Sequence, residues 1–428
     1  MSVPGPSVGA VYSTVAISGY RSLRDVRLPL GRLTVVTGAN GTGKSSVYRA
    51  LRLLADCGAG RVVGSLAREG GLGSALWAGP ESLGGARRGY AVEGTVRTGP
   101  VSLLMGVGGE GLSYLVDLGI PVQSGSAFDR DPEVKREAVW TGPVMRPSTL
   151  VARRRHHGVE LRDDGGRWEK APVTVQPWAS MLTEVVDPLA APELWAVREE
   201  LRSWRFYDGF RVDAGSPARV PQVGTRTWAL AEDGSDLAAA LQTIREDSRS
   251  ALEVAVADAF DGARLEVAVT DGLFDVRLHQ PGMLRPLRSA ELSDGTLRYL
   301  LWLAALMTPV PPRLMALNEP ETSLHPSLVG PLARLVATAS RRAQVVVVTH
   351  SEPLIRALCD ELLDGRDPRA GGDEDEDVDG PGGEGGMGGV GEPGIPPLRV
   401  VELTKDLGET LVAGQGLLTR PAWEWGRR

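Results

Sequence analysis

A glycine-rich stretch near the N-terminus has the residue types and spacing of a phosphate-binding loop. It runs from Gly38 to Ser45 as GANGTGKS and fits the pattern G-x-x-x-x-G-K-[ST]. Glycines at 38, 41 and 43 leave room for a close anion, and backbone N–H groups at a helix N-terminus can converge on it. We expect Lys44 to reach the β- and γ-phosphates of a nucleotide and the hydroxyl of Ser45 to complete a Mg²⁺ shell.

The sequence on either side of this loop supplies the elements that must position it. A β-branched run at residues 34–37 precedes the loop, and a helical pattern follows it, with Val47, Leu51 and Leu54 on one face. Strand, glycine loop and helix are the context in which the motif indicates nucleotide binding. The predicted nucleotide-binding residues are Gly38, Asn40, Gly41, Gly43, Lys44, Ser45 and Ser46.

Three later segments narrow the class of nucleotide-binding protein. They are LSDGT at residues 292–296, LMALNEPE at 314–321 followed by SLHP, and VVVVTHS at 345–351. In this order they resemble the signature motif, the Walker B strand with its D-loop, and the switch histidine of the ABC-type ATPase superfamily. The sequence is similar to the SMC/RecF-like branch, and within it to stand-alone bacterial AAA-family (OLD-like) ATPases without a Toprim domain. GYRSL, before the glycine loop, adds to this similarity.

The resemblance implies a role for each matched residue. Glu319, at the end of a buried-type strand, would be the general base for the attacking water, and His350, at the end of a neighbouring strand, would sense the γ-phosphate. Ser293 and the N–H of Gly295, at a helix N-terminus, would bind the ATP of a second subunit, so that two copies clamp two nucleotides head-to-tail. Each of these residues also has a structural interpretation, as a strand-end carboxylate, a capped histidine or a helix N-cap.

The chain departs from the family pattern at the metal site. The Walker B strand usually ends in Asp-Glu, whereas this chain has Asn318-Glu319. Asn318 keeps an acceptor oxygen for Mg²⁺ or its water but has no negative charge, so the sequence predicts slow turnover with Ser45 and Asn318 at the metal. The glutamine that usually links Mg²⁺ to the distal lobe has no clear position, and Gln123 and Gln176 both stay open.

The hydrophobic pattern predicts an α/β fold. We expect a P-loop NTPase with an ABC/SMC-type head, a mixed central sheet flanked by helices, an antiparallel β lobe and a helical lobe. The predicted units are core halves at 12–57 and 291–362, inserted sheet and helical lobes at 85–290, a disordered acidic linker at 364–397, and a terminal hairpin at 398–415. The insertion has no sustained heptads, which argues against a coiled-coil arm. Residues 58–80 are expected to form a loop with little regular structure, with one short helix as the alternative.

The overall composition is that of a globular protein. The chain has 428 residues, of which 42% are hydrophobic and 24% charged. Eight acidic residues and no Lys or Arg lie in the linker at 371–397, so the net charge of −7 leaves the rest of the chain close to neutral. No apolar run is long enough for a membrane span, and the N-terminus lacks signal-peptide features. We therefore expect a cytoplasmic location, no membrane partner, and reduced thiols at Cys57 and Cys359.

These features predict an ATPase with ATP and Mg²⁺ as cofactors. The resemblance further implies that ATP-dependent head-to-tail homodimerisation would switch an interaction with DNA or a separately encoded effector protein, in DNA maintenance or defence. The alternative is an ATP-dependent binding or regulatory module with negligible hydrolysis, because of Asn318. Little chain follows His350, which disfavours a Toprim nuclease, and the large insertion disfavours a transporter subunit.

Two basic features have open interpretations. Arg21 either approaches a phosphate or lies on the surface. The densest basic cluster, Arg153 to His157, either contacts DNA phosphates or forms a solvated strand edge or turn.

Overall fold

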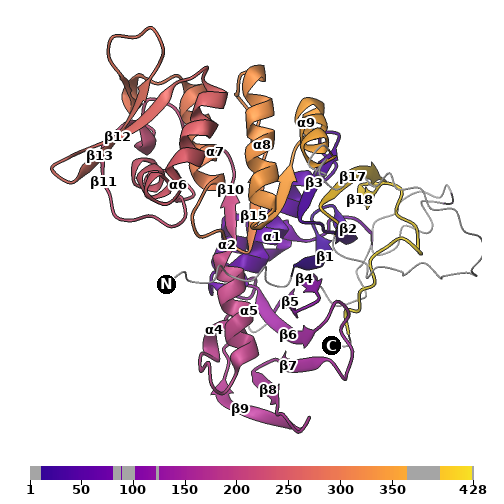
Figure 1. Cartoon of the computed structure of the whole chain (residues 1–428). Helices are drawn as coiled ribbons and strands as arrows, with labels where there is room; N and C mark the ends of the chain where they lie inside the picture. Colours follow the sequence, from indigo (N-terminus) through magenta and orange to yellow (C-terminus); the bar gives the residue numbers. More distant parts are fainter. Residues whose placement is uncertain (1–10, 81–87, 89–101, 122–124, 364–395, 427–428) are drawn as a thin grey trace, which may run out of the picture.

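The computed structural model describes residues 11–80, 88, 102–121, 125–363 and 396–426. Within them the strands form three sheets (Figure 1). The arrangement confirms the predicted α/β class, with a helix-flanked central sheet, an antiparallel lobe and a helical lobe. In the described part of the chain, no helix has both the length and the apolar character needed to cross a bilayer.

A six-stranded sheet carries the glycine loop and the later motifs. Its order is β10 (Arg205–Tyr207), β15 (Leu314–Asn318), β16 (Gln344–Val348), β3 (Leu33–Gly38), β17 (Leu398–Asp406) and β18 (Glu409–Val412). The first five strands are parallel, and β18 returns antiparallel to β17. Because the carboxyl ends of parallel strands meet at one edge of a sheet, the glycine loop and the segments after β15 and β16 lie together.

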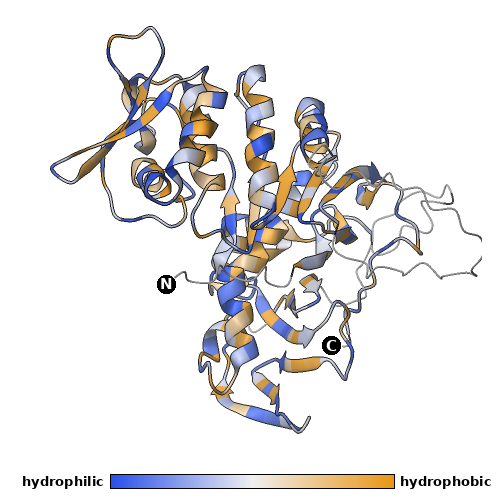
Figure 2. Cartoon of the chain, in the orientation of Figure 1, coloured by the Kyte–Doolittle hydropathy of each residue, from blue (hydrophilic) through white to orange (hydrophobic). Residues whose placement is uncertain are grey.

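Both faces of this sheet are covered, which explains its unbroken apolar strands. Val346 and Val348 pack in one core with α1 and the antiparallel sheet, whereas Val345 and Val347 pack in a second core with α7, α8 and α9. Figure 1 shows α7, α8 and α9 side by side, and Figure 2 shows hydrophobic residues concentrated on the central strands. The helices are α1 (Lys44–Gly58), α2 (Val62–Arg68), α3 (Leu72–Ala75), α4 (Met181–Glu184), α5 (Pro192–Ser203), α6 (Leu237–Ala259), α7 (Asp294–Leu306), α8 (Val329–Ser340) and α9 (Glu352–Leu363).

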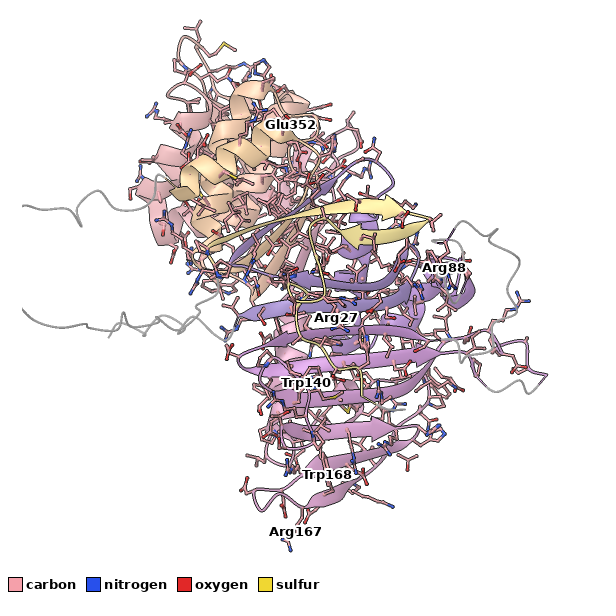
Figure 3. The ribbon with its side chains drawn as sticks, turned by 90° about the vertical axis from the view of Figure 1, so that its right-hand side faces the viewer. Arg27, Arg88, Trp140, Arg167, Trp168 and Glu352 are labelled. Carbon is pink, nitrogen blue, oxygen red and sulfur yellow. The ribbon has the colours of Figure 1, made fainter. Side chains whose placement is uncertain are left out.

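An eight-stranded antiparallel sheet forms the second layer (Figure 3). Its order is β2 (Leu23–Pro29), β1 (Tyr12–Tyr20), β4 (Leu103–Gly109), β5 (Leu112–Gly119), β6 (Glu133–Thr141), β7 (Leu150–Arg155), β8 (Gly158–Arg162) and β9 (Trp168–Thr174). Because β1 pairs with β4, this sheet begins before the glycine loop. Strands from both sides of residue 85, where we predicted the start of the inserted lobe, therefore belong to one sheet.

The third sheet lies at the far end of the molecule, against α6 (Figure 1). It consists of β11 (Gln222–Val223), β12 (Arg264–Thr270), β13 (Leu273–His279) and β14 (Leu287–Arg288). The Asp-Gly pair at 271–272 between two alternating runs predicts a hairpin, which is present, and both turn residues have positive φ. Short 3₁₀ turns at Pro217–Arg219, Ser289–Glu291 and Pro326–Leu328 connect the neighbouring elements.

The structure corrects one prediction and extends another. Residues 58–80 are not a loop, because α2 and α3 form there and bury Val62, Leu66 and Leu72 in the core. The C-terminal hairpin is confirmed as β17 and β18, and β17 additionally pairs in parallel with β3, the strand of the glycine loop. Residues 90–92, whose alternating pattern predicts a strand, lie outside the described residues, as do Gln123 and most of the acidic linker.

Candidate functional site

The glycine loop requires glycine at the points where the C-terminal hairpin approaches it. Gly38 and Gly43 have φ values of 142° and 106°, in the region that side chains disfavour. A Cβ atom at Gly38 would lie 2.3 Å from the carbonyl oxygen of Leu403, and one at Gly43 would lie 2.5 Å from Oγ1 of Thr410. The hairpin therefore packs directly on the loop and fixes its conformation.

Lys44 closes the loop on itself at the start of α1. Its Nζ atom donates to the carbonyl oxygens of Gly38 over 2.6 Å and Ala39 over 3.0 Å. The helix N-terminus at Gly43 has no side-chain cap. Its first N–H groups are therefore available to an anion, as in phosphate-binding loops.

A cavity of about 430 Å³ brings most of the predicted nucleotide-binding residues together with Glu319. The volume is in the range of ligand pockets. Gly38 is the one predicted loop residue that does not line it, because it lies behind the loop at the end of β3. The lining residues are Arg21, Ser22, Asn40, Gly41, Gly43, Lys44, Ser45, Ser46, Ser74, Leu76, Ala78, Glu319 and Lys405.

Glu319 and His350 meet just beyond their strands. The Nδ1 atom of His350 lies 3.2 Å from Oε1 of Glu319, so an Nδ1–H group can donate to the carboxylate. Both side chains are accessible, with relative exposures of 54% for His350 and 39% for Glu319. Glu319 has a φ of 46°, which is sparsely populated for a non-glycine residue. Such a conformation is typical of functional sites held by their surroundings, here by a hydrogen bond from its N–H to Val348.

The two polar atoms of the Asn318 side chain differ in their hydrogen bonding. Its Nδ2 atom donates to Oδ1 of Asp208 over 2.6 Å. Its Oδ1 atom is buried, and among the described residues no group donates to it. Because buried acceptors are normally paired, this oxygen fits a ligand that the chain itself does not supply, such as Mg²⁺ or its water.

The residues of the predicted signature lie on the surface at the start of α7. Ser293 is exposed and caps α7 by accepting a hydrogen bond from the N–H of Thr296 over 3.2 Å. Arg219, which is almost fully buried, fixes the residues on either side of Ser293. It donates to the carbonyl oxygen of Leu292 over 2.7 Å and pairs with Asp294. Neither Ser293 nor Gly295 lines the cavity of its own glycine loop.

The basic residues whose roles the sequence left open have different surroundings in the structure. Arg21 lines the cavity and also pairs with Glu69 over 2.6 Å, so it lies at the site and is anchored there. Arg154, in contrast, is fully buried and pairs with Glu137 in the antiparallel sheet, which makes it a structural residue. Arg153 pairs with Glu160 and lies 4.3 Å over the ring of Trp168.

Within the basic cluster at 153–157, Arg153 and Arg154 are therefore held by contacts in the sheet, whereas Arg155, His156 and His157 are exposed. Gln176, the described candidate for the metal-linking glutamine, is exposed in the same lobe and does not line the cavity.

Sequence reasoning missed the contribution of the hairpin to the site. Lys405 lines the cavity, and its Nζ atom donates to the carbonyl oxygen of Gly41 over 3.1 Å. The hydroxyl of Thr410 donates to the carbonyl oxygen of Thr42 over 2.7 Å and lies 2.8 Å from the hydroxyl of Ser22. The one available signal was the hairpin pattern itself, which indicated a return to the body but not a partner strand.

Comparison with protein families gives one match, to the model described as an AAA domain, putative AbiEii toxin, of a type IV toxin–antitoxin system. The match covers residues 33–100 and 115–357, which include the glycine loop and the later motifs. A search of curated proteins finds no match.

Solved structures with similar folds include three SMC heads. An SMC head bound to the C-terminal winged-helix domain of ScpA is 12% identical, with 95% of this chain and 98% of that chain covered and a TM-score of 0.45. The SMC head domain from Thermotoga maritima is 14% identical, with coverages of 95% and 100% and a TM-score of 0.40. An Smc head with an extended coiled coil, bound to the C-terminal domain of ScpA from Pyrococcus furiosus, is 11% identical, with coverages of 94% and 96% and a TM-score of 0.44.

Proposed function

The chain belongs to the family of AAA domains described as the putative AbiEii toxin of a type IV toxin–antitoxin system, and from this premise we propose that it binds ATP at the glycine loop and hydrolyses it. The observation that carries the proposal is the shared cavity, in which Lys44, Ser45 and Glu319 line the same space. A phosphate-binding group and a carboxylate at the end of a neighbouring strand are the combination that hydrolysis of a nucleotide needs.

The loop residues would bind and orient the phosphates. Lys44 exchanges its two carbonyl partners for phosphate oxygens, which are charged and therefore stronger acceptors. The uncapped N–H groups of α1 bind the same anion. Ser45 and Asn318 would hold Mg²⁺, which would neutralise charge on the β- and γ-phosphates.

Glu319 would act on the attacking water. Its carboxylate is accessible from the cavity and accepts the water proton, while His350, already within hydrogen-bond distance, orients it and contacts the γ-phosphate. Residues Lys405 and Arg21 add two positive charges to the wall of the cavity, which favours a polyphosphate over a neutral ligand.

The exposed signature residues support head-to-tail dimerisation. Ser293 and Gly295 lie at the N-terminus of α7 and do not reach the cavity of their own chain, so their anion-binding groups are free for the ATP of a second copy. ATP that binds the closed dimer better than the monomer shifts the population toward the dimer, and hydrolysis reverses the shift. We propose that this cycle switches an interaction with DNA or an effector. The description of the family as a putative toxin of a toxin–antitoxin system fits a defence role.

Phosphate release and ATP affinity, measured on three variants, test this function. The Lys44→Ala variant should lose ATP binding, because it removes the charged phosphate contact, whereas Lys170→Ala, at an exposed position on β9, should behave as wild type. The Glu319→Gln variant should keep ATP binding and lose turnover by at least about 100-fold, the lower range of general-base effects. Wild-type turnover in Glu319→Gln would show that Glu319 is not the base.

Because Asn318 replaces the usual aspartate, a second function is also compatible with the site. An ATP-dependent binding module with negligible hydrolysis would bind ATP tightly and release no phosphate above the background of the Lys44→Ala variant. The same assay therefore separates the two functions.

A further inference from the structure

Asp208 lies beside Asn318 where two neighbouring strands end. The parallel register pairs Tyr207 of β10 with Leu317 of β15, so Asp208, just after β10, comes beside Asn318, the last residue of β15, at the same edge of the sheet. The amide of Asn318 donates to the Asp208 carboxylate over 2.6 Å. Among the described residues, Asn318 is the one donor to this carboxylate. Asn318 immediately precedes Glu319, which lines the cavity of the glycine loop.

This contact fixes the orientation of the Asn318 amide. An ionised carboxylate only accepts hydrogen bonds, so the nitrogen of the amide faces Asp208 and its oxygen points away from it. That oxygen is the buried atom to which no described residue donates. Asp208 therefore selects the atom of Asn318 that a cation prefers, and the hydrogen bond to a charged group polarises the amide and strengthens its oxygen as a ligand.

Asp208 also lies close to α1, the helix that carries Ser45. Asp208 lines a second cavity, of about 430 Å³, together with Tyr48, Arg49 and Arg52 of α1. Burial, and after it the negative charge of Asp208, raises the pKa of Tyr48, which lies one turn after Ser45. The carboxylate thus lies between the end of β15 and the first turns of α1, the two elements that would hold the metal.

We propose that Asp208 supplies, through Asn318, the negative charge that the Walker B position of this chain lacks. Asp208 is a positioning residue, because it orients and polarises the Asn318 oxygen for nucleotide-bound Mg²⁺ without touching the ion. This inference rests on the proposed function, since it presupposes that Ser45 and Asn318 hold Mg²⁺. It accounts for how an asparagine can serve at a position where an aspartate is expected.

The affinity of a fluorescent ATP analogue, measured once with Mg²⁺ and once with EDTA, tests the role of Asp208. In the Asp208→Asn variant the gain in affinity from Mg²⁺ should fall by about 10- to 100-fold, the usual effect of losing a residue that orients a metal ligand. The affinity in EDTA should stay unchanged. Electron paramagnetic resonance with Mn²⁺ and ATP gives a second readout, because bound Mn²⁺ should fall in parallel.

Two further variants separate this role from a structural one. Glu232→Gln is the matched control, because Glu232 also contributes negative charge near Tyr48 but pairs with Arg52 instead of Asn318. It should keep the full gain from Mg²⁺. The exchange variant Asp208→Asn/Asn318→Asp retains one carboxylate and one amide in the pair, and it should recover most of the gain that Asp208→Asn loses.

The outcomes distinguish this inference from the proposed function. A wild-type protein that binds no ATP in either buffer would overturn the function and the inference with it. A wild type that gains affinity from Mg²⁺, with Asp208→Asn gaining as much, would overturn the inference alone. An exchange variant as weak as Asp208→Asn would also overturn it, because a carboxylate restored to the pair would then not recover the gain from Mg²⁺.

Discussion

The charged side chains at the glycine loop have polar partners within the chain. Lys44 is bonded to the carbonyl oxygens of the loop, and Glu319 is within reach of His350. In the proposed function, phosphate oxygens would be stronger acceptors for Lys44 than these carbonyl groups, because they are charged. The left-handed backbone of Glu319 fits the same account, because a conformation that costs free energy persists where the surroundings fix it.

Arg154 gives a prediction about stability at the scale of single residues. Its guanidinium group and the carboxylate of Glu137 are both fully buried and 3.1 Å apart. The Arg154→Ala variant leaves that carboxylate buried without its partner, so the free energy of unfolding should fall by about 3–5 kcal/mol. Denaturant unfolding measures this change.

The neighbouring arginine is the control for this prediction. Arg155 is exposed, and Arg155→Ala should change the free energy of unfolding by less than about 0.5 kcal/mol. Equal stability of the two variants would contradict the assignment of Arg154 to the core. A DNA-binding test of this cluster should therefore change Arg153 and Arg155 and leave Arg154 in place.

At the scale of elements, the C-terminal hairpin is a part of the nucleotide site. Figure 3 shows β17 and β18 between the helices and the antiparallel sheet. Lys405 and Thr410 each hold a carbonyl group of the glycine loop, at Gly41 and Thr42. The parallel pairing of β17 with β3 places these contacts on the loop although nearly the whole chain separates them in sequence.

The Thr410→Val variant tests the hairpin. Valine keeps the shape of threonine but leaves the carbonyl oxygen of Thr42 without its donor, so stability should fall by about 1–3 kcal/mol and ATP affinity should fall with it. Thermal unfolding and ATP titration measure the two effects. Thr404→Val, at an exposed position on β17, is the matched control and should be neutral. If the two variants behaved alike, the hairpin would not support the loop.

Local patterns in the sequence were sufficient to predict the helices and strands that carry the motifs. The β-branched runs predicted β3 and β16, and the helical periodicity predicted α1 and α7. The same reasoning failed for α2, because Gly and Ser residues concealed the spacing of Val62 and Leu66.

Long-range pairing left no local pattern to read. No repeat or spacing indicates that β1 pairs with β4, that β17 pairs with β3, or that β10 brings Asp208 to Asn318. The residues missed at the site, Lys405, Thr410 and Asp208, all reach it through such pairings. Strand partners depend on the packing of the whole fold, which is why the motif residues were found and their supports were not.

At the scale of the whole molecule, the family match confirms the predicted relation to AAA-domain proteins. The antiparallel sheet extends one face of the nucleotide-binding core, and the helical lobe with its small sheet extends the other. The signature residues belong to the helical side, and the glycine loop lies at the edge of the central sheet. Under the proposed head-to-tail dimerisation, a second copy would supply Ser293 to complete the site.

Mixing two inactive variants tests this central claim most directly. Lys44→Ala lacks its own nucleotide site but keeps Ser293, whereas Ser293→Arg keeps the glycine loop but blocks the signature surface. Each variant alone should release no phosphate above background. A mixed dimer contains one intact composite site, so the mixture should hydrolyse ATP faster than the sum of its parts. Wild-type turnover by Ser293→Arg alone, or a mixture no more active than that sum, would contradict the claim.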